Sequence, residues 1–452
     1  MRHQRKTQLK FSSRPITGKP FTIPSAGAFP QNCRVPSQFI QPRLTCDISI
    51  SRSTWLDHLE KTNSTAPSLP FPDEPQQQLA DVGERVKRNI PGPWTVRFRL
   101  RYQDLDRAPA FTVYPLGRVH IRFQAIDYWR WPPSGIETGL VLDGAGNGIL
   151  NLPEGDYANA KATLYFENDL FSLKQGRYFN IPTLPPTTWS IPLPVSSYGT
   201  NGFMVEYVMP SEIGPNLGHL WWSFHDIRAV AHGLIYLSAV PGTTLWYPFP
   251  KPDGTAYYGD LIGIEARYGK GRIVHAHEYG HHVMQHLATG GIPPAGRDES
   301  SDHSLCSTVS PRMAYIEGYA DAFALHVLHS DSFWWTPGES GVNLAHYVCP
   351  VDMDMITSEG RVAAGLLDLL DHERVVPECN HLRPENGRAG YCDLTHDPTT
   401  FLFEWVIFRE SIVGPRVASI RDWWERLAAA HSTGVDFASA LEAMRFNYYP
   451  LS

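Results

Sequence analysis

The chain of 452 residues has few charged side chains and no excess of positive charge. Charged residues make up 19% of it, and 39 Lys and Arg stand against 46 Asp and Glu, which gives a formal net charge of -7. Proteins that bind the phosphate backbone of nucleic acids need a surplus of cations, so this composition argues against a nucleic acid partner. The longest apolar run, residues 229–240, is interrupted by His232 and Gly233 and is much shorter than the ~20 residues that cross a bilayer. The sequence therefore predicts no transmembrane segment.

Cysteine is also scarce, with six residues in the chain and no C-x-x-C pair of the kind that holds a structural zinc. Four of the six fall in the C-terminal half: Cys306, Cys349, Cys379 and Cys392. Two disulfides among them would suit an oxidising compartment, and the short separation of Cys379 and Cys392 favours that pair. Scattered buried thiols are the alternative.

The N-terminal segment lacks acidic residues and does not indicate a destination clearly. Residues 1–46 contain no Asp or Glu, and no continuous apolar stretch follows the basic start, so no secretory signal peptide is visible. A transit peptide, a basic irregular tail and a wrongly assigned start are the interpretations that this composition leaves open. With the cysteines taken into account, we favour a secreted or extracytoplasmic protein.

No internal repeat is present, and the chain instead changes character along its length. Residues 1–92 are rich in Pro, Gln and Ser and are expected to be mostly irregular. Alternation of apolar and polar residues then predicts strands at 94–102, 119–123, 139–142, 148–152 and 162–166. Such strands indicate a β-sandwich over residues 93–195, similar to the transthyretin-like or immunoglobulin-like accessory domains of many secreted enzymes. The proline-rich residues 182–194 are interpreted as the linker that ends it.

Helical periodicity replaces the strand pattern in residues 196–452. Apolar residues repeat at helical spacing from Ile227 to Ile235, and the pair Pro241-Gly242 is expected to stop that helix. We therefore expect a multidomain α+β protein, in which a β-sandwich accessory domain is followed by a mostly α-helical domain.

One helix of that domain carries a metal-binding pattern. The segment from Arg272 to Leu287 contains His277-Glu278-Tyr279-Gly280-His281, which is H-E-x-x-H. Residues four apart lie on one face of a helix, so His277 and His281 can reach one Zn²⁺. Glu278 then lies beside them, where its carboxylate can take a proton from a water on the metal. The pattern is short, so a second element has to support it.

That second element is Glu317-Gly318-Tyr319-Ala320-Asp321. Ser310 followed by Pro311 is a good helix start, so Glu317 and Asp321 are expected one turn apart on a helix. If Glu317 supplies the third ligand, Asp321 can hydrogen-bond a ligand imidazole from behind and fix its tautomer. Asp321 as the third ligand, as in the aspzincins, is the alternative.

The two motifs together resemble those of the gluzincins, the thermolysin-like zinc metallopeptidases, in which an H-E-x-x-H helix is followed by a helix bearing Glu-x-x-x-Asp. The resemblance implies a zincin-like catalytic domain that binds zinc through His277, His281 and Glu317. It further implies Glu278 as the general base and Asp321 as the partner of His277. The metzincin branch is excluded, because its extra Gly and His are replaced by Met284 and Leu287.

The family also uses a His or Tyr to stabilise the oxyanion, and three residues are candidates for this role: Tyr347, His372 and His396. Tyr279, Tyr315 and Tyr319 are excluded because each lies two residues from a ligand on its own helix and should point away. Asp352 and Asp354, and the Gly-rich residues 143–148, are weaker candidates for calcium; a solvated loop and a plain hairpin are the favoured interpretations.

The sequence thus predicts a zinc-dependent peptidase, most simply an endopeptidase, that acts on peptide or protein substrates. Two alternatives stay open: a zinc hydrolase of a non-peptide amide, and a catalytically inactive metal-containing binding protein. The presence of Glu278 argues against the second, because a purely structural zinc needs no base. For the β-sandwich we expect carbohydrate or protein binding.

Overall fold

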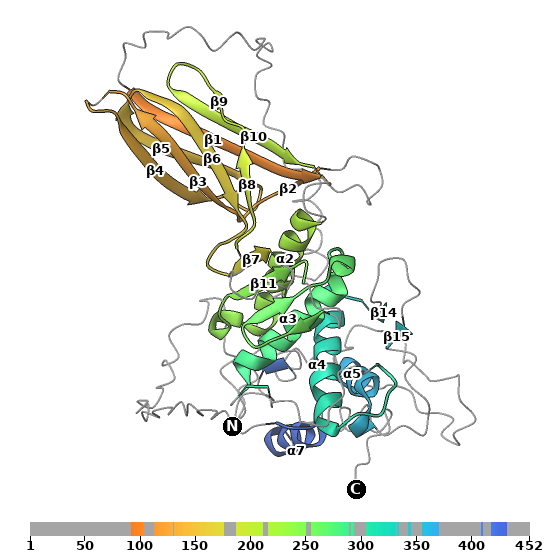
Figure 1. Ribbon diagram of the computed structural model, residues 1–452. Coiled ribbons are helices and arrows are strands. Elements are labelled where there is room, and N and C mark those ends of the chain that lie inside the picture. The colour runs from red at the N-terminus through yellow and green to blue at the C-terminus, as the bar shows by residue number, and fades with distance from the viewer. Residues whose placement is uncertain are drawn as a thin grey trace, which may run out of the picture. The chain divides into compact units, whose positions relative to one another are not determined.

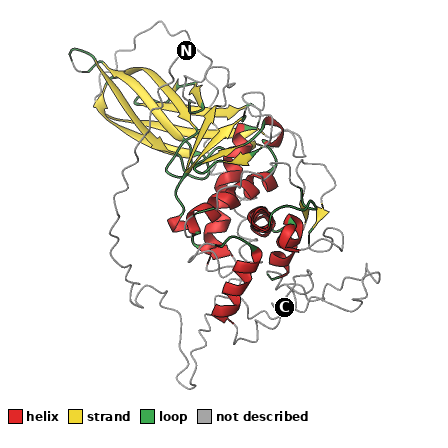
Figure 2. Cartoon of the chain, turned by 60° about the horizontal axis from the view of Figure 1, so that its bottom comes forward, coloured by secondary structure: helices red, strands yellow, loops and turns green. Residues whose placement is uncertain are grey.

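The computed structural model describes parts of the chain that all lie in the compact unit Lys87–Ser452. The described residues are 92–103, 113–129, 131–175, 187–210, 216–249, 255–288, 291–292, 304–330, 332–333, 342–344, 355–369, 408–409 and 417–431. Strands dominate up to residue 210 and helices dominate after it (Figure 2). Among these residues, no helix has the length and apolar character needed to cross a membrane.

The first strands form two sheets (Figure 1). One sheet consists of β1 (Gly92–Gln103), β2 (Val113–Pro115), β5 (Asn147–Gly155), β9 (Ser196–Ser197) and β10 (Gly202–Met209). Its order is β2-β1-β10-β9, and β5 also pairs with β1. The other has the order β4-β3-β6-β8, and its members are β3 (His120–Asp127), β4 (Ser134–Val141), β6 (Tyr157–Tyr165) and β8 (Ser190–Leu193).

Alternating apolar residues give these strands their buried faces. In β1, for example, Val96, Phe98 and Leu100 are buried, whereas the residues between them are partly or fully exposed. The two sheets meet through aromatic rings. The ring centroids of Trp94 in β1 and Tyr157 in β6 are 5.6 Å apart. Those of Phe123 in β3 and Phe203 in β10 are 5.7 Å apart. The faces of the two sheets therefore share one hydrophobic core.

A third sheet combines β7, which precedes β8 in the chain, with three strands that follow α2, in the order β12-β13-β11-β7. Its strands are β7 (Phe171–Gln175), β11 (Thr243–Tyr247), β12 (Ala256–Tyr257) and β13 (Leu261–Gly263). Helix α2 (Leu217–Ile235) contacts it, since the rings of Phe171 and Phe224 lie 5.9 Å apart. The indole nitrogen of Trp221 in α2 also donates to the carbonyl of Gly117, just before β3, at 3.0 Å. Helix α2 thus contacts both β7 and the start of the strand-rich part.

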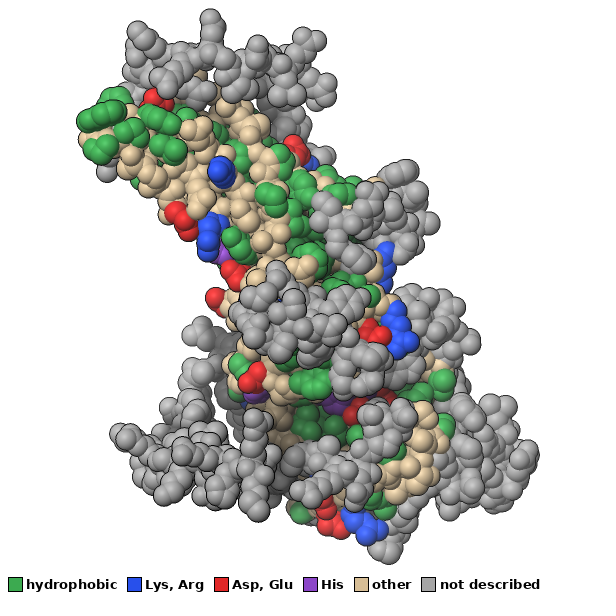
Figure 3. All heavy atoms as spheres, viewed as in Figure 1, with side chains coloured by type: hydrophobic (Ala, Val, Ile, Leu, Met, Phe, Trp, Pro, Cys, Tyr) green, Lys and Arg blue, Asp and Glu red, His purple; other side chains and the backbone are tan. Residues whose placement is uncertain are grey.

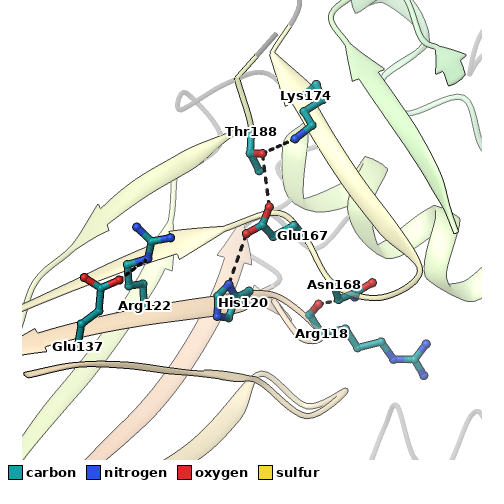
Figure 4. A network of polar contacts seen from close by, with 8 residues as sticks. All are labelled: Arg118, His120, Arg122, Glu137, Glu167, Asn168, Lys174 and Thr188. Atoms are coloured by element: carbon teal, nitrogen blue, oxygen red, sulfur yellow. Dashed lines mark hydrogen bonds and ion pairs between the residues drawn. The ribbon is translucent and has the colours of Figure 1, made fainter. Parts of the chain in front are cut away.

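A small polar network ties the second sheet to β7 (Figure 4). Glu167 lies 3.5 Å from Nδ1 of His120 through one oxygen and accepts a hydrogen bond from the Thr188 hydroxyl through the other. Lys174 in β7 donates to the same Thr188 hydroxyl at 2.6 Å. These partly exposed groups link three segments that are far apart in sequence.

The remaining helices include the two that carry the predicted metal ligands. They are α3 (Arg272–Leu287), α4 (Pro311–Leu328), α5 (Glu359–Asp368) and α7 (Ile420–His431). Two short 3-10 helices, η1 (Leu237–Ala239) and η2 (Ala266–Tyr268), precede α3. Three short elements lie between α4 and α5: β14 (Ser332–Phe333), β15 (Val342–Asn343) and η3 (Met355–Thr357). Gly318 lets α5 approach α4 closely, because a Cβ there would lie 2.6 Å from Cβ of Val362.

Each of the five predicted strands corresponds to a strand of the structure, namely β1, β3, β4, β5 and β6. The region around the expected linker is different. β8 lies within residues 182–194 and pairs with β6, and β10 lies beyond residue 195 and pairs in parallel with β1 from Thr95 to Tyr102. The strands of the first two sheets therefore extend to Met209. Between β4 and β5, Asp143 accepts hydrogen bonds from Gly146 N and Asn147 N, which closes a tight turn. The predicted hairpin is wrong, because β4 pairs with β3 whereas β5 pairs with β1 in the other sheet, so this turn passes from one sheet to the other.

Candidate metal centre

Helix α3 is the core of the candidate site. It spans Arg272–Leu287, the same residues that the sequence analysis assigned to the H-E-x-x-H helix, and nearly all of its side chains are buried. His277 and His281 lie one turn apart, and their Nε2 atoms are 3.1 Å apart. Both rings therefore direct the same nitrogen to one point beside the helix.

Helix α4 supplies a carboxylate at that point. It begins as expected, with Pro311 in its first turn and the Ser310 hydroxyl accepting a hydrogen bond from Met313 N at 3.1 Å. Further along α4, Oε2 of Glu317 lies 3.2 Å from Nε2 of His277 and 3.2 Å from Nε2 of His281. The two helices thus bring two imidazoles and one carboxylate together.

These three atoms form a nearly equilateral triangle with edges of 3.1 to 3.2 Å. Zinc binds such ligands at ~2.0–2.1 Å, so two ligands of a tetrahedral ion are about 3.3 Å apart. The triangle therefore has the size of one face of a tetrahedral zinc site. Among the described residues, these three are the group of His, Cys, Asp and Glu side chains that could hold a metal ion. The donor set fits zinc.

Asp321 lies behind this triangle. Its Oδ1 is 2.7 Å from Nδ1 of His277, on the side of the ring opposite Glu317. A carboxylate in this position accepts the Nδ1 proton and leaves the Nε2 lone pair free for a metal. Asp321 therefore does not point into the triangle, and the geometry favours Glu317 over Asp321 as the third candidate ligand.

The charges of the site support this division of roles. Burial alone disfavours ionised Glu317, but the charge of His281 and the hydrogen bonds from both imidazoles lower its pKa well below the usual value. Burial and the neighbouring Glu359 raise the pKa of Asp321 well above its usual value, in spite of His277. The pKa of His277 is raised although burial opposes its charge, because Asp321 and Glu317 both hydrogen-bond it.

Glu278 is buried in the same helix, with 4% of its surface exposed. It follows His277 directly, and its negative charge contributes to the raised pKa of that imidazole. A buried carboxylate next to a candidate metal ligand on the same helix is suited to accepting a proton.

The other histidines of α3 have structural partners elsewhere. His275 is fully buried, with Nδ1 2.9 Å from the Ser223 hydroxyl and Nε2 2.8 Å from the carbonyl of Tyr268. His282 has Nε2 3.1 Å from the carbonyl of Pro241, and burial lowers its pKa to about 4. His286 lies 3.5 Å from Asp260. These three histidines thus contact groups other than the His277, His281 and Glu317 side chains.

The tyrosines that helix geometry excluded also face elsewhere. The Tyr279 hydroxyl accepts a hydrogen bond from Arg228 at 2.6 Å, and the Tyr319 hydroxyl donates to the carbonyl of Phe408 at 2.9 Å. Tyr315 is buried on the same face of α4 as Tyr319. The oxyanion candidates Tyr347, His372 and His396, and also Asp352 and Asp354, lie outside the described residues.

Two residues near the site were not found from the sequence. Tyr257 in the short strand β12 has its ring nearly parallel to that of His281, with the centroids 6.3 Å apart. Glu359, the first residue of α5, is fully buried and neighbours Asp321. Neither residue belongs to a helix that carries a candidate ligand, so no sequence spacing relates it to the site. Only the tertiary fold brings Tyr257 and Glu359 here.

The comparisons with known proteins agree with this location. Residues 239–381 match the family model described as the mycolysin C-terminal domain, which relates this part of the chain to metallopeptidases. The matched segment includes His277, His281, Glu317 and Asp321. No curated protein matches the chain at a significant level.

Proposed function

We propose that the protein is a zinc-dependent peptidase that hydrolyses peptide or protein substrates. The observation that carries the proposal is the triangle of His277 Nε2, His281 Nε2 and Glu317 Oε2, whose edges match those of a tetrahedral zinc site. These residues would hold the ion and leave the fourth position open, as a catalytic zinc requires. The family match to residues 239–381 supports a peptidase of this kind.

The chemistry divides among a few side chains. A zinc ion held there supplies Lewis-acid polarisation to a scissile carbonyl and to an attacking water. Glu278 takes the proton from that water and passes it to the leaving amine. Asp321 holds His277 in the tautomer whose Nε2 faces the metal, and burial of all these groups strengthens each electrostatic contact.

We also propose an architecture for the described part of the chain. The two facing sheets of residues 92–209 form a β-sandwich accessory domain, and the third sheet, to which β7 belongs, forms a zincin-like catalytic domain together with the helices from α2 onward. This moves the proposed boundary from residue 195 to about residue 210, because β10 belongs with β1. Cys306 is disulfide-bonded, with its partner outside the described residues, which supports the proposal of an oxidising compartment.

The two other functions considered have less support. A structural zinc usually has four protein ligands, whereas the triangle offers three and a buried Glu278 stands beside it. A non-peptide amide could be cleaved by the same groups, but the match to a peptidase domain favours a peptide substrate.

The experiment is a peptidase assay on the full chain, with zinc content measured on the same samples. Wild type should cleave unfolded casein, and Glu278→Gln should lose activity by about 100-fold or more, since general acid–base catalysis contributes ~10²–10⁴. The variant should keep its zinc, because Glu278 is not a ligand. Glu137→Gln, an exposed carboxylate in β4, is the matched control and should behave as wild type. Full activity in Glu278→Gln, or no cleavage by zinc-loaded wild type, would rule the proposal out.

A further inference from the structure

The end of the strand-rich part that lies away from α2 carries unusually exposed aromatic side chains. In the loop between β3 and β4, Tyr128 is 43% exposed, Trp129 57% and Trp131 92%. Hydrophobic side chains gather at this end of the molecule in the space-filling view (Figure 3, upper left). Large exposed aromatic groups cost free energy in water, so they commonly mark a binding surface.

The loop is held by hydrogen bonds instead of being loosely attached. Oδ1 of Asp127, a buried carboxylate, accepts from Trp129 N at 2.9 Å and from Asp156 N at 3.0 Å. Tyr128 N donates to the carbonyl of Asp156 at 2.8 Å, and the Tyr128 hydroxyl accepts from the side-chain amide of Asn159. These bonds fix the backbone at Tyr128 and Trp129, which lowers the entropy that these two residues lose on binding.

The strand register separates this loop from the metal centre. α2 meets the start of β3 through the bond from Trp221 to Gly117, whereas the loop follows Asp127 at the other end of that strand. At ~3.3 Å per residue, the two ends of β3 are more than about 20 Å apart. A ligand on the loop would not occupy the metal centre.

The size and charge of the surface restrict the class of ligand. A fully exposed aromatic side chain presents an area of ~150–250 Å². At the exposures given above, the three side chains together present roughly 300–500 Å² to solvent. This area is less than the ~800 Å² that each partner buries in a standard protein interface. Anionic membranes bind aromatic anchors that are reinforced by Lys and Arg. Of the charged side chains that the structure describes on this surface, Glu154 and Asp156 are acidic, and the loop sequence itself contributes a single basic residue, Arg130.

We propose that the β3–β4 loop, with Trp129 and Trp131 as its main contacts, binds a neutral polysaccharide. The apolar C–H face of a pyranose ring packs on the electron-rich face of an indole, and a row of sugars needs only two or three such rings. The Asn159 amide and the Tyr128 hydroxyl add hydrogen-bonding groups at the edge of the surface. Binding there would hold the chain on an insoluble matrix while leaving the metal centre free for its substrate.

The test measures depletion of the full chain from solution by microcrystalline cellulose and, separately, by chitin. Wild type should bind at least one of them, and Trp129→Ala/Trp131→Ala should weaken that binding by at least about tenfold, because the apolar contact area is lost. Ile149→Ala removes another exposed apolar side chain from the same sheets, 63% exposed in β5, and should bind as wild type. The double variant should keep its thermal unfolding temperature and its zinc content.

Sedimentation with vesicles of phosphatidylcholine and phosphatidylglycerol forms the second arm, in which wild type should stay in solution. The proposal is overturned if neither polysaccharide binds the chain, if the double variant binds as tightly as wild type, or if tryptophan-dependent binding occurs to the vesicles alone. Since none of these readouts involves peptide cleavage, they remain informative even if the proposed peptidase activity fails.

Discussion

Oδ1 of Asp321 lies 2.7 Å from Nδ1 of His277, and the opposite nitrogen of the same ring lies 3.2 Å from Oε2 of Glu317. One imidazole is thus held between two carboxylates that come from the same helix, one turn apart. Asp321 fixes the orientation of the ring, and Glu317 lies beside the nitrogen that would bind the metal. For His281, by contrast, Nδ1 has no hydrogen-bond partner within the part of the chain that the structure describes.

This asymmetry makes Asp321 important for metal affinity. Asp321→Ala should weaken zinc binding by about 10–100-fold, because His277 loses the group that fixes its tautomer. Asp321→Asn should lose less, since its side-chain oxygen still accepts the Nδ1 proton. Competition with a chelator of known affinity measures both effects. Wild-type affinity in Asp321→Ala would show that the contact is not needed.

Glu359 extends the same chain of contacts by one residue. Burial and this second carboxyl group raise the pKa of Asp321, and two carboxyl groups in a dry site are most stable when they share one proton. Glu359→Gln should keep near wild-type zinc affinity, because its amide can donate to Asp321. Glu359→Ala should weaken zinc binding and lower stability by ~1–3 kcal/mol. Equal affinities for the two variants, measured by the same competition, would contradict this role.

The sequence predicted those parts of the site that depend on spacing within one helix. His277 and His281 are four residues apart, and Ser310 and Pro311 mark the start of α4, so both helices could be placed from local rules. The parallel pairing of β1 with β10 could not, because it joins Thr95 to Gly202 and no local period records such a partner. Glu359 was missed for the same reason.

The burial of His225 predicts that the folded protein becomes less stable as the pH falls. Burial, with Arg118 and Arg228 nearby, lowers the pKa of His225 to about 3. The Asn168 amide nitrogen lies 3.1 Å from His225 Nε2, while its amide oxygen accepts from Leu170 N and Phe171 N. That nitrogen is therefore a donor, and His225 must be neutral to accept from it.

The folded pKa of His225 is below the unfolded value of about 6.5, so this contribution to stability is present above pH ~6.5 and is lost as the pH falls toward 3. It should decrease by up to ~1.4 kcal/mol per pH unit in that range. His225→Gln cannot be protonated but can still accept from Asn168, so its stability should decrease less steeply. Urea unfolding between pH 6.5 and pH 4.5 measures the two slopes, and parallel slopes would contradict the assignment.

Two helical glycines offer a matched test of the packing between α4 and α5. A Cβ on Gly318 would lie 2.6 Å from Cβ of Val362 and 2.7 Å from the carbonyl oxygen of Glu359, so Gly318→Ala should destabilise the protein by ~1–3 kcal/mol. Gly233 in α2 has nothing within 4 Å of the same position, and Gly233→Ala should stabilise by ~0.5–1 kcal/mol. Denaturant unfolding should give shifts of opposite sign. A neutral or stabilising Gly318→Ala would show that the helices are not so closely packed.

The most direct test of the proposed metal centre is the zinc content of the purified full chain, measured by mass spectrometry for wild type and for Glu317→Ala. Glu137→Gln, an exposed carboxylate far from the site in sequence, serves as the control. The proposed site predicts about one zinc per chain in wild type and in the control, with a sharp reduction in Glu317→Ala. A wild-type chain without bound metal, or zinc that is unaffected by the loss of Glu317, would contradict it.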